Sequence, residues 1–127
     1  MNINSERLAQ IFTTMCTIDS PSGKEARLAR FLTDLFAQEF PEAVIAEDNS
    51  AMVTGSDSNN LISQFPGSLD GEPIFFNCHL DTVEPGRGIQ VVREGSRFTS
   101  AGDTILGGDD KAGLAILIEA IRTTKEA

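Results

Sequence analysis

Apolar residues recur at the spacing of one helix face in three segments of the chain, and each segment predicts an amphipathic helix. We expect these helices at residues 4–17, from the turn at residues 19–23 to a stop at Pro41, and at residues 110–125. Ser22 and Glu25 have the spacing of a capping box, so Ser22 is expected to cap the second helix. The stripes comprise Leu8, Ile11, Phe12 and Met15, then Leu28, Phe31, Leu32, Leu35 and Phe36, and finally Leu114, Leu117, Ile118 and Ile121.

Shorter apolar runs between turn residues predict strands in the middle of the chain. Strands are expected at residues 43–47, 61–65 and 73–80, with a polar loop at 49–60 and a hairpin built from 89–92 and 97–99. The run at 73–80 is apolar almost throughout, which is typical of a central strand covered on both faces. This order of elements predicts an α/β fold, in which helices pack on a mixed, mostly parallel sheet in three layers.

Composition narrows the range of partners. The chain has 127 residues, enough for one domain or part of one, and its net charge of −9 disfavours nucleic acid and anionic membranes. No run is long and apolar enough for a membrane span, and the first residues lack the features of a signal peptide. Two cysteines, Cys16 and Cys78, are too few for a disulfide framework and are expected to be small buried apolar residues. A cytoplasmic protein is therefore expected.

One candidate site follows the apolar run at 73–80, where His79 and Asp81 lie two positions apart. On a strand both side chains point to the same face, so the carboxylate can accept the second ring N–H of the imidazole. That contact fixes the tautomer of a metal-ligating histidine. Cys78 would face the other way and is not expected to be a ligand. Taken alone, the pair also fits an ordinary surface or core histidine.

The second candidate site is the Gly107-Gly108-Asp109-Asp110 segment at the start of the last helix. Aspartate at a helix N-terminus is a common cap, which accounts for one carboxylate. One cap needs neither two aspartates nor two flanking glycines. We therefore expect Asp109 to project into a site as a bridging carboxylate while Asp110 caps the helix. His79 and Asp109 would then converge on one cation position.

Together these segments resemble a known family. The residues at 19–25 (DSPSGKE), at 79–83 (HLDTV) followed by Pro85-Gly86, and at 104–113 (TILGGDDKAG) are similar to motifs of the peptidase T-like branch of the dinuclear zinc metallopeptidases. This superfamily also contains aminoacylases and succinyl-diaminopimelate desuccinylase. The resemblance extends from about Leu8 to Ala127, and its last two motifs are the most specific.

The resemblance implies a two-zinc hydrolase that cleaves amide bonds of short peptides or N-acyl amino acids. By position, His79 corresponds to a zinc ligand, Asp109 to the carboxylate that bridges both metals, and Asp81 to the catalytic carboxylate that orients His79. A zinc-bound water becomes hydroxide near neutral pH and can attack a scissile carbonyl. Cobalt or manganese could replace zinc in a carboxylate-rich site.

The resemblance also implies that residues 1–127 are the N-terminal portion of a catalytic domain. The remaining ligands, the general base and an inserted domain that often serves dimerisation in the family have no counterpart here, so the full-length protein could be a homodimer. Two ligands do not complete a four-coordinate zinc site, so we expect this chain alone to be inactive and to bind zinc weakly. An N-acyl amino acid deacylase and a noncatalytic α/β interaction module are the alternatives to a peptidase.

Overall fold

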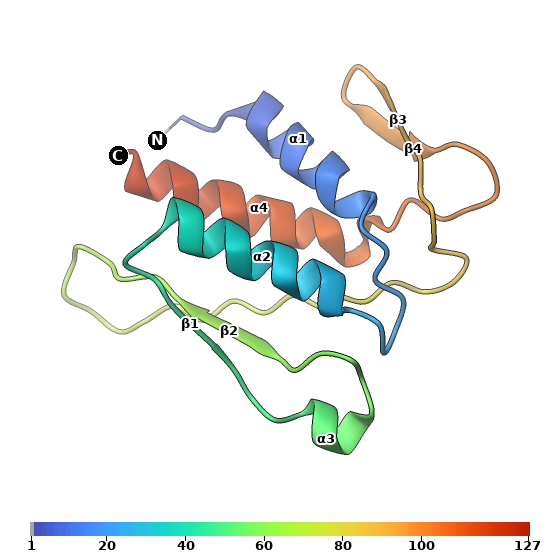
Figure 1. Ribbon diagram of the computed structural model, residues 1–127. Coiled ribbons are helices and arrows are strands. Elements are labelled where there is room, and N and C mark those ends of the chain that lie inside the picture. Colours follow the sequence, from blue (N-terminus) through green and yellow to red (C-terminus); the bar gives the residue numbers. More distant parts are fainter. Residues whose placement is uncertain (1) are drawn as a thin grey trace.

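The core lies among three long helices whose apolar stripes face one another. The computed structural model describes residues 2–127. Figure 1 shows α1, α2 and α4 running side by side, with one antiparallel strand pair below α2 and a second beside α1. The elements are α1 (Ser5–Cys16), α2 (Ala26–Glu39), β1 (Val44–Glu47), α3 (Ala51–Thr54), β2 (Leu61–Gln64), β3 (Val91–Glu94), β4 (Arg97–Ser100) and α4 (Gly108–Lys125).

The three helical stripes of the sequence are confirmed as the source of this core. Their buried residues form one cluster, to which α1, α2 and α4 all contribute, together with Phe40 at the end of α2. The ring of Phe65, after β2, packs edge-on against Phe36 and Phe40 at centroid distances of 5.2 and 5.3 Å. The buried cluster consists of Ile11, Met15, Leu28, Leu32, Phe36, Phe40, Leu114, Ala115 and Ile118.

The helix boundaries follow the expected pattern except at the start of α2. In α1 the side chain of Asn4 accepts a hydrogen bond from the backbone N–H of Arg7, as an N-cap should. The predicted capping box at α2 is wrong. Glu25 takes the cap position without a capping hydrogen bond from its side chain, and its carboxylate accepts instead from the Gly23 N–H and the Ser56 hydroxyl. The Ser22 hydroxyl is used elsewhere.

Both sheets among residues 2–127 are two-stranded and antiparallel. β1 pairs with β2 so that Val44 lies opposite Gln64, and β3 pairs with β4 as the predicted hairpin. The polar segment at 49–60 is a loop as expected except for the short helix α3. That helix begins where Asp48 accepts from the backbone N–H and the hydroxyl of Ser50.

The expected strand at residues 73–80 is not a strand in the described structure. This segment forms no β-ladder, and its apolar side chains Ile74, Phe75 and Phe76 are 79%, 86% and 63% exposed. A strand needs a neighbour for its backbone N–H and C=O groups, and no other segment within residues 2–127 supplies one. The chain is therefore α/β as expected, but the three-layer, mostly parallel sheet is not present in it. The single parallel pairing in this range is the isolated bridge between Pro21 and Thr82.

Polar contacts join the ends of the helices. The guanidinium of Arg7 on α1 pairs with the nearly buried carboxylate of Glu119 on α4 at 2.8 Å. The same carboxylate accepts from the Asn4 backbone N–H at 2.9 Å, so Glu119 fixes the start of α1 against α4. No helix within residues 2–127 has the length and apolar character needed to cross a bilayer.

The helix core gives a direct test of stability. Ile118 is 1% exposed in the cluster, whereas Ile116 on the same helix is 59% exposed. We expect Ile118→Ala to lower the free energy of unfolding by about 2–5 kcal/mol, because it leaves a cavity between helices. Ile116→Ala should change it by no more than about 0.5 kcal/mol. Urea denaturation followed by circular dichroism measures both, and equal effects would contradict the packing described here.

Candidate metal centre

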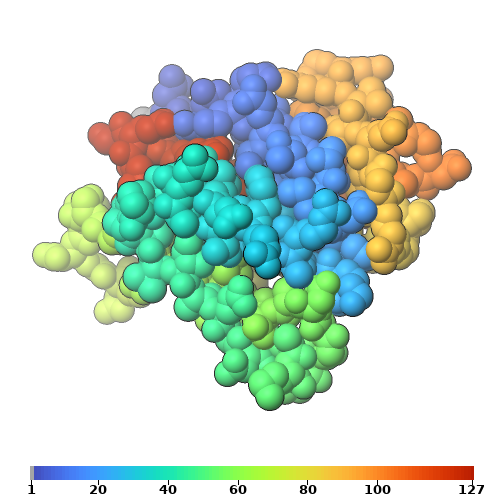
Figure 2. Space-filling model, in the orientation of Figure 1, coloured from blue at the N-terminus to red at the C-terminus, as the bar shows by residue number. Residues whose placement is uncertain are grey.

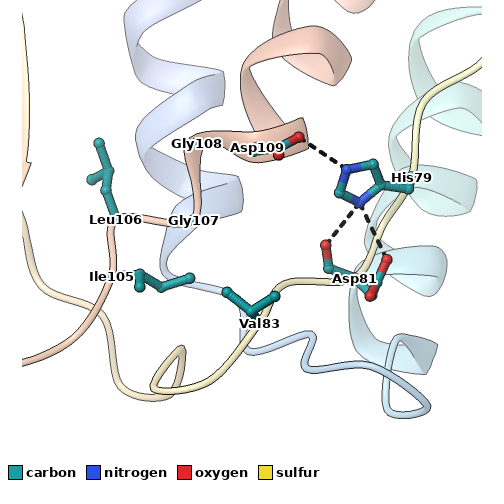
Figure 3. Close-up of a pocket in the computed structure, with 8 residues that line it drawn as sticks. All are labelled: His79, Asp81, Val83, Ile105, Leu106, Gly107, Gly108 and Asp109. Carbon is teal, nitrogen blue, oxygen red and sulfur yellow. Dashed lines mark hydrogen bonds and ion pairs between the residues drawn. The ribbon is translucent and has the colours of Figure 1, made fainter.

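The imidazole of His79 lies between two carboxylates, as Figure 3 shows. Its Nε2 is 3.0 Å from Oδ1 of Asp109. Its Nδ1 is 2.9 Å from the backbone carbonyl oxygen of Asp81 and 3.2 Å from Oδ1 of the same residue. The sequence motifs led us to expect that His79 and Asp109 converge, and the structure brings these side chains together from positions 30 residues apart. His79 and Asp81 lie in contact, as their spacing of two residues predicted, although the segment is not in a strand.

The loop after α1 holds the segment that carries His79. The Ser20 side chain is fully buried, and its hydroxyl donates to the Leu80 carbonyl at 2.8 Å. The Ser20 carbonyl in turn accepts from the Thr82 backbone N–H at 2.9 Å. The Ser22 hydroxyl donates to Oδ2 of Asp81. Residues 20–22 therefore replace the missing strand neighbour for residues 80–82.

Asp109 is presented by an irregular start of α4. Gly107, at the cap position, has φ of 75°, a left-handed conformation that favours glycine. A Cβ at Gly107 would also meet Cγ2 of Thr82 at 3.3 Å, so a glycine lets the two segments approach closely. Asp109 has φ and ψ of −92° and 106°, outside the helical region, and its peptide bond to Asp110 is cis. The Asp109 side chain is 95% exposed and points away from the helix.

Asp110 was expected to cap the helix. Gly107, at the α4 cap position, has no side chain with which to cap the helix, and Asp110 has non-helical φ and ψ of −117° and 28°. Its carboxylate lies over Gly113, where an added Cβ would come within 2.2 Å of Oδ1. The two adjacent carboxylates therefore point to different surroundings, and among them only Asp109 contacts His79.

Lys111 anchors this helix start from inside the protein. Its side chain is fully buried, and Nζ donates to the Ile18 carbonyl at 2.8 Å. Burial lowers the pKa of the Lys111 ammonium, while Asp19 nearby opposes that shift. Neither this contact nor the Ser22 contact with Asp81 was predicted from the sequence, although Lys111 and Ser22 both lie in the sequence motifs. Each joins segments more than 50 residues apart, so local spacing gave no signal.

The electrostatics of the site favour a charged imidazole. Hydrogen bonding to Asp109 is the main cause that raises the pKa of His79, and burial opposes it. Both ring nitrogens face acceptor oxygens, so a protonated imidazole can donate a hydrogen bond from each of them. Burial also raises the pKa of the Cys78 thiol to about 11, with a further contribution from Asp110. The half-buried Cys78 packs against the core cluster, and Cys16 is fully buried, as expected for apolar rather than ligating cysteines.

An apolar wall completes the pocket around His79. Val83, Ile105 and Leu106 line it together with the two glycines before Asp109 (Figure 3). These three residues belong to the two sequence motifs, but only the structure shows that they line the same pocket as His79 and Asp109. Within residues 2–127 no group of three or more His, Cys, Asp and Glu side chains is placed to hold a metal ion. The site therefore offers one nitrogen and one carboxylate oxygen, fewer than the three or four protein ligands of a zinc site.

Two solved structures match this fold over nearly the whole chain. Aminopeptidase PepT from Bacillus cereus ATCC 10987 is 42% identical, with a TM-score of 0.91, and the match covers 98% of this chain and 33% of that one. A tripeptidase from Staphylococcus aureus subsp. aureus Mu50 is 31% identical, with a TM-score of 0.90 and the same coverage of both chains. The resemblance to peptidase T-like proteins is therefore confirmed in sequence and in fold.

A further relative is known from its sequence. The uncharacterized protein YqjE of Bacillus subtilis strain 168 is 38% identical over 124 residues, which are 98% of this chain and 33% of that protein. No protein-family profile matches the chain. The chain thus spans about a third of the length of the relatives it matches.

The contact between His79 and Asp109 predicts a measurable pKa change. The raised pKa means that the protonated imidazole stabilises the folded chain below the unfolded value of about 6.5, and that this contribution is lost as pH rises through the folded value. We expect Asp109→Asn to lower the pKa of His79 towards the unfolded value. Asp110→Asn should leave it nearly unchanged. NMR titration of the single imidazole in chelator-treated protein tests this, and equal shifts in both variants would contradict the contact.

Proposed function

We propose that this chain supplies the first metal ligands of a peptidase T-like, metal-dependent hydrolase that cleaves amide bonds of short peptides. The observation that carries the proposal is the arrangement of His79, with Nδ1 on Asp81 and Nε2 directed at Asp109. The same fold occurs in two proteins named as an aminopeptidase and a tripeptidase. In this proposal His79 and Asp109 are ligands, and Asp81 is the carboxylate that orients His79.

The donor chemistry fits zinc. A hydrogen on Nδ1 held by Asp81 leaves Nε2 as the ring atom that can bind a cation, which would take the place of the Nε2 hydrogen. Imidazole nitrogen and carboxylate oxygen are both common zinc ligands, and cobalt or manganese could use the same set. The 95% exposed side chain of Asp109 also has a carboxylate oxygen free of His79, as a bridge between two cations requires.

Each residue of the site then has a definite task. His79 and Asp109 would hold the zinc ion, which when bound would supply an acidified water and a Lewis acid for the scissile carbonyl. Asp81 keeps the His79 imidazole in one tautomer and one orientation. The open start of α4 at Gly107 and Gly108 leaves Asp109 free of the helix, and the apolar wall of Val83, Ile105 and Leu106 excludes water from one side.

The exposure of the segment at residues 73–80 is the observation that favours a larger catalytic domain. Ile74, Phe75 and Phe76 are mostly exposed, and the backbone of this segment lacks a strand partner within residues 2–127. The two solved relatives of this chain are about three times as long as the matched region. We propose that further chain pairs with this segment in a three-layer, mostly parallel sheet and supplies the remaining ligands. A cytoplasmic location and a homodimeric assembly are further parts of this proposal.

An N-acyl amino acid deacylase is the nearest alternative, because the same metal ligands would serve it. A noncatalytic α/β module is the alternative from another class, and it requires no metal at His79. The names of the two solved relatives favour a peptidase over both. Substrate choice depends on residues outside this site, so an assay must decide.

The chain itself should bind zinc weakly. Only His79 and Asp109 converge, and two donors leave a four-coordinate ion mostly hydrated. We expect calorimetric titration of residues 1–127 with zinc to show no tight stoichiometric binding. His79→Ala should remove the residual weak binding, which is the control for adventitious sites on an acidic surface. Tight binding that survives this variant would place the metal elsewhere.

A longer protein that contains this chain should hydrolyse di- and tripeptides faster than N-acyl amino acids, and a chelator should stop the reaction. Asp109→Ala should abolish hydrolysis and lower the metal content, because it removes the bridging carboxylate. Metal analysis and product release measure the two effects.

Asp110→Ala is the matched control, since its carboxylate lies at Gly113 and not at His79. It should retain the metal. Equal loss of metal from both variants would contradict the assignment of Asp109, whereas preference for N-acyl amino acids would favour the deacylase. Chelator-resistant hydrolysis would rule out the metal-dependent mechanism.

A further inference from the structure

Three successive residues of the loop after α1 contact three successive residues around Asp81. Ser20 binds Leu80 and Thr82 through its hydroxyl and carbonyl, and Pro21 forms a parallel bridge with Thr82. Asp81, between Leu80 and Thr82, makes a contact between side chains, in which Oδ2 accepts from the Ser22 hydroxyl. The backbone contacts fix where the loop lies, and the Ser22 contact acts on the carboxylate itself.

The two oxygens of Asp81 have different partners. Oδ2 accepts from Ser22, and Oδ1 lies 3.2 Å from Nδ1 of His79. The Asp81 side chain is 37% exposed, so without a second contact its carboxylate is free to rotate towards water. A donor on Oδ2 therefore selects the rotamer in which Oδ1 faces the imidazole.

We propose that Ser22 is a positioning residue that fixes His79 through Asp81. The Ser22 hydroxyl holds the Asp81 carboxylate, whose Oδ1 lies 3.2 Å from Nδ1 of His79 beside the Asp81 backbone carbonyl oxygen at 2.9 Å, and Nε2 is left directed at Asp109. This inference rests on the proposed function for its consequence, which is tighter metal binding at Nε2. Ser22 itself binds neither metal nor substrate.

A helix-capping role does not account for Ser22. α2 begins at Ala26, with Glu25 at the cap position, and Ser22 makes no hydrogen bond to that helix. The backbone of the loop is already held by Ser20 and by the bridge to Thr82. The exposed Ser22 side chain is thus free of any packing role, and its hydroxyl is the feature that matters.

The test compares Ser22→Thr with Ser22→Val, which have nearly the same shape but differ in the hydroxyl. His79 is the only histidine, so ¹⁵N-labelled histidine gives signals from one imidazole. In chelator-treated protein above the pKa of His79, the ¹⁵N shifts report the share of the Nδ1–H tautomer. We expect wild type and Ser22→Thr to keep this tautomer and Ser22→Val to lose part of it to the Nε2–H form.

Zinc titration followed on the same signals gives the second readout. The dissociation constant for zinc should rise about 2- to 10-fold in Ser22→Val relative to Ser22→Thr, the size expected for one lost hydrogen bond. Ser56→Ala is the matched control, because this hydroxyl donates to Glu25 in the neighbouring loop and not to Asp81. It should change neither readout.

The outcomes separate this inference from the proposed function. Equal tautomer populations in the Thr and Val variants would overturn the role of Ser22, whatever zinc does. His79 signals that do not respond to zinc in the wild type would contradict the metal site, while the tautomer comparison would still decide whether Ser22 positions the imidazole. Thermal unfolding of each variant confirms that the comparison is made between folded proteins.

Discussion

The buried ammonium of Lys111 imposes the constraint on which the site depends. A charge with no exposed surface must be hydrogen-bonded, and Lys111 meets that need at the Ile18 carbonyl, 2.8 Å away. This contact ties the start of α4 to the loop that follows α1. Since Asp109 lies two residues before Lys111, the anchor sets where its carboxylate emerges, and the apolar packing of α1 against α4 keeps both ends in place.

The same loop also holds the other half of the site. The Ile18 carbonyl accepts a hydrogen bond from Lys111, whereas Ser20 and Ser22 hydrogen-bond to Leu80 and Asp81. Residues 18–22 of the connection between α1 and α2 thus hold both the segment of His79 and the helix start that carries Asp109. In Figure 2 the yellow-green loop after β2 and the orange β3–β4 hairpin project from the surface that the blue and cyan helices α1 and α2 form. In the proposed function, a cation site supported by residues 18–22 would need little reorganisation to bind the metal.

Much of this was predictable from the sequence where the signal was local. The helices α1, α2 and α4 follow the apolar stripes, and the β3–β4 hairpin follows two short runs separated by turn residues. The pairing of His79 with Asp81 follows from a spacing of two residues. The capping box at Ser22 and the strand at 73–80 were wrong for one reason. Each pattern indicates a local conformation that the segment favours, but the partners come from the tertiary structure. The Ser22 hydroxyl hydrogen-bonds to Asp81, and the segment at 73–80 has no strand to pair with within residues 2–127.

The sequence by itself determined which residue types are present and which local conformations they favour. It singled out His79 and Asp109 as candidate ligands and Asp81 as the carboxylate that orients His79. Only the tertiary structure decided that Nε2 of His79 lies 3.0 Å from Asp109, that Ser22 holds Asp81, and that Lys111 is buried. Propensity and spacing act over a few residues, whereas these contacts join segments 30 to 93 residues apart. Their formation depends on how the helices pack as a whole.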